Sequence, residues 1–228
     1  MKLLLTSAGV RNPAIHHALL ELLPKPIDEC TALAIPTAGY GHPYATPQGA
    51  WRFASGHEWR CPMVDLGWKS VGLLEMAALP TLPRERWVAA VEAADVLLAN
   101  GGDSLYLAHH MRACGFDELL PSLDAVWVGL SGGSMVLTPH IGEDFKAWDP
   151  PEGGDKALGI VDFAMFPHLD HPDLPENTMA DAEKWAATMD VQCYAMDDET
   201  AIKWVDGELE VVSGTGHWKL LNSPPLNA

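Results

Sequence analysis

The chain has 228 residues, of which 48% are hydrophobic, so it is long and apolar enough to bury a substantial core. Its formal net charge is −17 with only 14 lysines and arginines, which argues against nucleic acid and anionic membrane surfaces as partners. The four cysteines are scattered and include no Cys-x-x-Cys pair, as is typical of ordinary thiols in a reducing compartment.

The N-terminal segment, residues 1–7, carries one charge and only a short apolar run. This run is too short for the apolar core of a signal peptide, and it favours a first buried strand over residues 2–7. No stretch of the sequence approaches the roughly 18 apolar residues of a membrane-spanning helix. We therefore expect a cytoplasmic protein without a membrane partner.

Short apolar runs alternate with helical patterns along most of the chain. The apolar runs predict strands at residues 2–7, 31–36, 63–66, 95–99, 126–128 and 160–166. The helical patterns predict helices at residues 13–23, 47–58, 83–94, 104–114 and 176–189, with another directly after residue 131. Two helix starts are marked by capping residues: Asn12 before Pro13, and either Asp103 or Ser104.

This alternation predicts an α/β fold, a three-layer sandwich with a mostly parallel central sheet. The C-terminal part differs, because residues 201–205 and 209–213 flank an Asp206-Gly207 turn and predict a β-hairpin. One further strand is predicted at 217–221. The sequence contains no internal repeat, linker or break in composition, so we expect one domain over residues 1–228.

The segment that follows the strand at 126–128 carries the strongest functional signal. It reads Gly129-Leu130-Ser131-Gly132-Gly133, and an apolar segment follows at once. A Gly-x-Ser-x-Gly pattern between a strand and a helix is the nucleophile elbow of hydrolases. Its glycines permit a strained turn that exposes the serine hydroxyl. The segment therefore predicts Ser131 as the nucleophile of an acyl-transfer reaction.

Such a nucleophile requires hydrogen-bond donors for the oxyanion that develops during attack. The backbone N–H of Gly132 follows the serine directly and is one candidate. The Gly101-Gly102 loop, at the carboxyl end of a neighbouring parallel strand, either supplies the second donor or simply makes the strand-to-helix turn.

The nucleophile also requires a base, and the sequence offers two histidines. His168 follows an apolar strand, and His217 lies near the C-terminus. The order of the triad in α/β-hydrolases would give Ser131, Asp198 and His217. Spacing alone does not choose between the two histidines. The His-x-x-His spacing of His168 and His171 lies on a loop and lacks the helical geometry of a zinc site, so no metal is predicted.

Several motifs together resemble one known family. The order of the strands, the loop at 100–104, the elbow and the Pro167-His168 dipeptide are similar to the aspartyl dipeptidases (dipeptidase E) of peptidase family S51. These enzymes are serine relatives of the class I glutamine amidotransferases. The resemblance covers residues 2 to about 214. One departure is Gly132, where the family has alanine in its elbow.

The resemblance implies a class I glutamine amidotransferase-like fold and a serine peptidase that needs no cofactor. It implies a triad of Ser131, His168 and a carboxylate after a late strand, which corresponds to Asp198. Asp197 and Glu199 are its direct neighbours, and a shift of one residue would exchange them. The family usually has glutamate at this position.

The resemblance also implies a small peptide as substrate and a monomer or homodimer. An acidic residue after the elbow corresponds to Asp144 or Glu143, which either binds the substrate α-ammonium group or is a solvated loop charge. The family prefers an N-terminal aspartate and brings an arginine on the helix after its histidine. Residues 175–181 contain no arginine, and a buried carboxylate without a cation is unfavourable. We therefore expect a dipeptidase-E-like hydrolase without strong aspartyl specificity.

Two other functions are compatible with these residues. One is an esterase or amidase of the α/β-hydrolase type, with His217 as its base. The other is a non-catalytic amidotransferase-like domain that binds a small metabolite or a partner. Glutaminase chemistry would need cysteine at the elbow, where this chain has Ser131.

Overall fold

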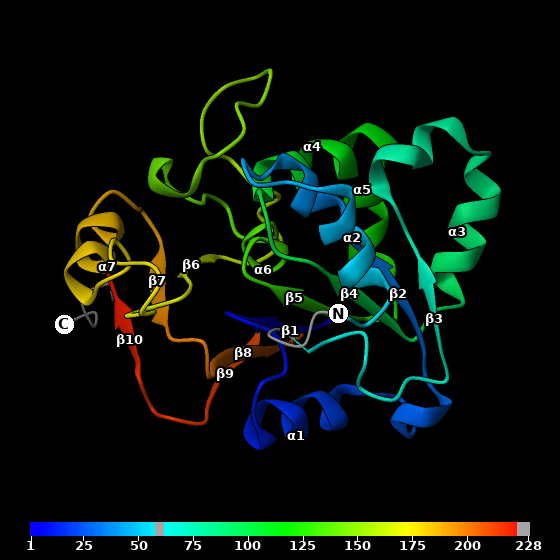
Figure 1. Cartoon of the computed structure of the whole chain (residues 1–228), viewed down its shortest axis with the longest axis horizontal. Helices are drawn as coiled ribbons and strands as arrows, with labels where there is room; N and C mark the ends of the chain where they lie inside the picture. Colours follow the sequence, from blue (N-terminus) through cyan, green and yellow to red (C-terminus); the bar gives the residue numbers. More distant parts are fainter. Residues whose placement is uncertain (58–61, 223–228) are drawn as a thin grey trace.

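The computed structural model describes residues 1–57 and 62–222 (Figure 1). Its central sheet has seven strands in the order β3-β2-β4-β5-β1-β8-β9. The strands are β1 (Lys2–Thr6), β2 (Thr31–Ile35), β3 (Ser70–Leu73), β4 (Val96–Ala99), β5 (Val126–Leu130), β8 (Thr200–Val205) and β9 (Glu208–Ser213). The first five in this spatial order are parallel, whereas β8 runs antiparallel to β1 and β9 runs antiparallel to β8.

Helices cover both faces of this sheet, which confirms the three-layer α/β fold. In Figure 1, α1 lies below the central sheet and α4 lies above it. Alternate residues of the buried strands point to opposite faces: Leu4 packs with α1, whereas Leu3 and Trp127 pack with the helices of the other face. The main helices are α1 (Pro13–Leu22), α2 (Pro47–Ala54), α3 (Arg84–Glu92), α4 (Ser104–Cys114) and α5 (Phe116–Leu119).

Three strands form a separate small sheet that the sequence did not distinguish from the central one. Its order is β10-β7-β6, and α7 packs against it at the left of Figure 1. Phe163 and Tyr194 of this sheet join the hydrophobic cluster of the central sheet, so the two sheets share a core. These elements are β6 (Phe163–Phe166), β7 (Gln192–Met196), β10 (Trp218–Leu221) and α7 (Met179–Ala186).

Short helical turns complete the fold at the ends of several strands. One of them, the four-residue helix α6 (Gly132–Met135), directly follows the elbow serine. The 3₁₀ turns are η1 (Ile27–Glu29), η2 (Thr37–Gly41), η3 (Met76–Thr81), η4 (Leu120–Ser122) and η5 (Glu143–Phe145).

Most predicted elements are present, with ends shifted by a few residues. The Asn12 side chain accepts a hydrogen bond from the Ile15 N–H at 3.0 Å and caps α1. Asp103, not Ser104, caps α4. The predicted hairpin is confirmed as β8 and β9. The prediction for residues 47–58 is only partly testable, because α2 ends at Ala54 and residue 58 lies outside the described residues.

The strand predicted at 63–66 is wrong. These residues form a turn, and the edge strand is β3, which lies a few residues later. All four residues of β3 are exposed, and the strand pairs with β2 alone in the central sheet. An exposed edge strand lacks the buried apolar run on which the prediction relied.

Within the described part of the chain, no helix combines the length and the apolar character that crossing a bilayer requires.

Candidate active site

Ser131 lies at the carboxyl end of β5, in the sharp turn that the sequence predicts. Its backbone has φ of 47° and ψ of −114°, a conformation that is unfavourable for a residue with a side chain. Backbone hydrogen bonds hold it there: its N–H donates to the Thr6 carbonyl at 3.0 Å, and its own carbonyl accepts from the N–H groups of Ser134 and Met135. The strain is therefore stabilised by β1 on one side and by α6 on the other.

The loop after β4 packs directly against this turn. A Cβ atom on Gly132 would lie 2.2 Å from the Gly102 carbonyl oxygen, so the two backbones approach closely only because residue 132 is glycine. Gly102 itself has φ of 133°, in the region that favours glycine. Within the described residues, the N–H groups of Gly102 and Gly132 donate to no backbone carbonyl. Gly102 also lines the cavity described next, whereas Gly132 is buried and is not among its described lining residues.

A cavity of about 570 Å³ opens beside the elbow, and both Ser131 and His168 line it. Gly101 and Gly102 form part of the same wall. The structure thus brings together the predicted nucleophile, one of the two candidate bases and the glycine loop. The remaining lining residues are His42, Pro43, Tyr44, Asn100, Asp103, Leu130, Asp144, Phe145, Lys146, Ala147, Leu174, Glu176 and Asn177.

His217, the other candidate base, is not among the described residues that line this cavity. Its Nε2 atom lies 2.8 Å from Asp170 Oδ2, and about half of its side chain is exposed. The structure therefore does not bring His217 together with Ser131.

His168 follows β6 and is held by its backbone and by its ring. Its φ is 57°, and its backbone N–H donates to Ser7 Oγ at 2.7 Å. Ring atom Nδ1 lies 2.6 Å from Asp198 Oδ1. A proton on Nδ1, donated to this carboxylate, leaves Nε2 as the basic nitrogen of the imidazole.

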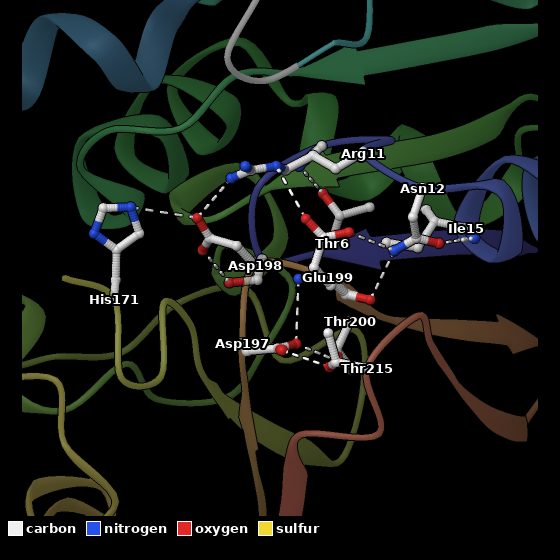
Figure 2. A network of polar contacts seen from close by, with 12 residues as sticks. Thr6, Arg11, Asn12, Ile15, His171, Asp197, Asp198, Glu199, Thr200 and Thr215 are labelled. Atoms are coloured by element: carbon white, nitrogen blue, oxygen red, sulfur yellow. Dashed lines mark hydrogen bonds and ion pairs between the residues drawn. The ribbon is translucent and has the colours of Figure 1, made fainter. Parts of the chain in front are cut away.

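Asp198 is surrounded by positive and hydrogen-bonding groups (Figure 2). Besides His168, Arg11 Nη1 lies 2.8 Å and His171 Nε2 lies 3.6 Å from its Oδ2 atom. The Ser7 hydroxyl donates to its Oδ1 atom at 3.4 Å. Burial alone would raise the pKa of Asp198, but the hydrogen bond with His168 and the nearby charges outweigh burial and lower that pKa. The carboxylate is therefore held in its charged form.

The acids on either side of Asp198 have other partners. Asp197 accepts hydrogen bonds from the hydroxyls of Thr200 and Thr215, each at 2.6 Å, as Figure 2 shows. Glu199 accepts one from Asn12 Nδ2 at 3.0 Å and lies 3.5 Å from Arg11 Nε. Of the three acids, Asp198 is the one that contacts His168.

Arg11 and Ser7 had no role predicted from the sequence, and His171 was considered only as a metal ligand. Arg11 and Ser7 lie in the loop after β1, more than 150 residues from His168 and Asp198. No local sequence pattern marks these two residues. Their loop reaches the site because β1 lies between β5, its parallel neighbour, and β8, its antiparallel neighbour.

The two acidic residues after the elbow differ in position. Asp144 lines the cavity, whereas Glu143 pairs with Lys146 Nζ at 2.9 Å and is not among the described lining residues. Glu176 and Asn177 also line the cavity, although the sequence analysis gave them no role. The cavity wall thus carries two exposed carboxylates, those of Asp144 and Glu176.

In residues 1–57 and 62–222, no group of three or more His, Cys, Asp or Glu side chains is arranged to hold a metal ion. His171 instead contacts Asp198, and Asp170 contacts His217.

Comparisons with known proteins give a matching family model and similar solved structures. The sequence model of "Peptidase family S51" matches residues 3–212 of the chain. No curated protein matches the chain. Among solved structures, a Listeria monocytogenes EGD-e protein named "Putative Peptidase E Protein" has a TM-score of 0.65 and 19% identity, over 93% of this chain and 98% of that one. A peptidase from an acI-B1 Actinobacterium has a TM-score of 0.60 and 21% identity, over 93% of this chain and 87% of that one. At these identities, the two structures support the fold alone.

Proposed function

The chain belongs to peptidase family S51, and on that premise we propose that it is a serine peptidase that hydrolyses short peptides through an acyl-enzyme on Ser131. One observation carries the proposal: His168, with Asp198 2.6 Å from its Nδ1 atom, shares a cavity with the strained serine. This arrangement supplies a nucleophile, a base and an orienting carboxylate in the chain order Ser-His-Asp.

The proposed reaction proceeds in two halves. His168 Nε2 accepts the proton of Ser131 Oγ as this oxygen attacks the peptide carbonyl, and Asp198 stabilises the imidazolium that forms. The N–H groups of Gly102 and Gly132 donate to the oxyanion of the tetrahedral intermediate. His168 then protonates the leaving amine, and the C–N bond breaks. A water molecule, deprotonated by His168, attacks the ester carbonyl, and the ester C–O bond breaks to release the acid and restore Ser131.

The size of the cavity supports a short peptide as substrate. Its volume of about 570 Å³ is within the ordinary range of small-molecule sites. The carboxylate of Asp144 provides an acceptor for the α-ammonium group of such a peptide. We also propose that the enzyme lacks strong aspartyl specificity, because the lysine that lines the cavity, Lys146, already pairs with Glu143 at 2.9 Å and Asp149 at 3.3 Å.

Labelling with a fluorophosphonate tests the nucleophile. We expect stoichiometric modification of Ser131, identified by peptide mass spectrometry, and none in Ser131→Ala. His168→Ala should abolish both labelling and peptide hydrolysis, whereas His217→Ala should retain both. Modification that persists in Ser131→Ala, or turnover that depends on His217 and not on His168, would contradict the proposal.

Cleavage of dipeptides tests the substrate class. We expect hydrolysis of Leu-Leu and Ala-Leu at rates at least equal to that of Asp-Leu, measured as kcat/KM. Faster cleavage of Asp-Leu than of both neutral dipeptides would show that the aspartyl preference is retained.

A further inference from the structure

A second compartment of about 340 Å³ lies beside the active-site cavity. Four residues line both spaces and form the boundary between them: Asp144, Phe145, Glu176 and Asn177. The second compartment, here called the acidic arm, is additionally lined by Phe166, Asp181 and Lys184. The acidic arm therefore lies next to the space in which a peptide would be held at Ser131.

Two carboxylates of the acidic arm have no cation beside them. Asp144 and Glu176 form no ion pair with any residue in the described ranges. Both lie where the arm joins the main cavity, since both line the two spaces. Their charges therefore act on whatever occupies this junction.

The lysines nearby do not cancel these charges, because each already has its own carboxylate. Lys146 lies between Glu143 and Asp149, at 2.9 and 3.3 Å. Lys184 lies 3.1 Å from Asp181. Taken together, these groups leave the acidic arm with a net negative charge.

Asn177 adds a neutral acceptor to the same wall and is itself only 7% exposed. Its backbone N–H donates to the Leu174 carbonyl, its backbone carbonyl accepts from the Asp170 N–H, and its Nδ2 donates to the Pro167 carbonyl at 3.0 Å. Its remaining polar atom, Oδ1, accepts no hydrogen bond from the residues that the structure describes and is not one of their fully buried atoms. Because Asn177 lines both spaces, this atom can accept a hydrogen bond from a ligand.

The walls of the acidic arm also include apolar surface. Phe145 and Phe166 lie edge to face with their ring centroids 5.1 Å apart. Aromatic rings of this kind can pack against the methylene stem of a lysine or arginine while its charged end reaches polar groups.

We propose that the acidic arm binds the side chain of an N-terminal lysine or arginine, so that the enzyme prefers short peptides with a basic first residue. This inference rests on the proposed function. The free α-ammonium group of a peptide belongs to its first residue, and Asp144 attracts it to the junction of the two spaces. The side chain of that same residue then lies next to the acidic arm, where the unpaired carboxylate of Glu176 attracts a basic group.

Steady-state hydrolysis of Lys-Leu, Met-Leu and Glu-Leu tests this preference, because the three first residues have stems of similar length. We expect kcat/KM to decrease in that order. The advantage of Lys-Leu over Met-Leu should be about three- to tenfold, as expected for one or two partly exposed ion pairs, and should shrink as salt is added. Equal values for Lys-Leu and Met-Leu, or faster cleavage of Leu-Lys than of Lys-Leu, would overturn the proposal.

Single substitutions assign the preference to its residues. Glu176→Gln should reduce the ratio of kcat/KM for Lys-Leu over Met-Leu, whereas Asp144→Asn should lower kcat/KM for both dipeptides and leave the ratio nearly unchanged. Asp173→Asn is the matched control, because Asp173 is an exposed acid in the same loop as Glu176 and is not among the described lining residues. A ratio that falls equally in Asp173→Asn would mean that only overall charge matters, which overturns the proposal.

Binding to Ser131→Ala separates failure of this inference from failure of the proposed function. Calorimetry should show tighter binding of Lys-Leu than of Met-Leu, with the difference lost in Ser131→Ala/Glu176→Gln. Equal affinities overturn the inference whether or not the unmodified enzyme turns over. Conversely, absence of Ser131 labelling and of all hydrolysis would reject the proposed function and leave the binding result to decide the role of the acidic arm.

Discussion

Three consecutive acids, Asp197, Asp198 and Glu199, have different partners in the structure, and this separates their expected roles. Asp198 contacts His168, so Asp198→Asn should lower kcat by about 10³- to 10⁴-fold, because the imidazole loses its orienting charge. Asp197 instead accepts hydrogen bonds from Thr200 and Thr215. Asp197→Asn should lower the free energy of unfolding by about 1–3 kcal/mol and leave most of kcat intact. Dipeptide hydrolysis and urea denaturation of both variants measure the two effects.

These two variants also control for each other, since they remove the same charge from adjacent positions. A loss of kcat in Asp197→Asn comparable with that in Asp198→Asn would mean that the charge of this segment matters more than the contact with His168. The sequence left this choice open because a shift of one residue exchanges the acids. Only the hydrogen bonds made in the folded chain distinguish them.

The lowered pKa of Asp198 predicts how stability depends on pH. A carboxyl whose pKa is lower in the folded protein adds stability above its ordinary value of 3.8, and this contribution is lost as the pH falls through the lower folded value. We therefore expect the stability advantage of the unmodified protein over Asp198→Asn to be full at pH 6 and to shrink as the pH falls below about 4. Urea denaturation of both proteins from pH 6 to pH 3 measures it. An advantage that stays constant, or grows towards low pH, would contradict the lowered pKa.

At the scale of elements, the site depends on the contact between the loop after β4 and the elbow. Gly132→Ala would place a Cβ atom 2.2 Å from the Gly102 carbonyl oxygen, so the two loops must separate. Because both proposed oxyanion donors lie at this contact, we expect kcat to fall by about 10²- to 10³-fold, as for loss of one such donor. Gly49→Ala in α2 is the control, since its Cβ would meet only Thr46 Oγ1, at an ordinary 3.5 Å. Unchanged kcat in Gly132→Ala would show that the two amides do not act together.

Elements with a local signal could be predicted from the sequence. The elbow has its glycines, α1 and α4 have Asn12 and Asp103 as caps, and the hairpin of β8 and β9 has Asp206-Gly207 at its turn. The strand β3 has no such signal. Leu73 in this strand is 62% exposed, and its neighbours are exposed as well, so no buried apolar run marks this edge of the sheet.

At the scale of the whole molecule, the site is shared between two sheets. Ser131 follows β5 of the central sheet, whereas His168 follows β6 of the small sheet. Asp198 lies between β7 of the small sheet and β8 of the central one. The sequence could not predict this division, because the apolar runs of both sheets look alike and strand pairing is decided by contacts between distant residues. The relative position of the two sheets therefore determines how His168 approaches Ser131.

Phe163 offers a test of this dependence, because it joins the small sheet to the core of the central one. Its ring is 2% exposed and lies edge to face with Tyr194 at 5.5 Å. Phe163→Leu should lower the free energy of unfolding by about 1–2 kcal/mol. It should also reduce kcat by about tenfold or more, since small displacements of catalytic groups slow the chemistry strongly.

Phe53 provides the matched control, because it is also 2% exposed but belongs to the hydrophobic cluster on the opposite face of the central sheet. Phe53→Leu should destabilise the protein by a similar amount, about 1–2 kcal/mol, and leave kcat unchanged at temperatures where both variants are folded. Urea denaturation and single-turnover acylation of Ser131 measure the two quantities. If both variants lose kcat in proportion to their loss of stability, general destabilisation explains the effect. If only Phe163→Leu loses kcat, the position of the small sheet sets the geometry of His168 and Asp198 relative to the serine.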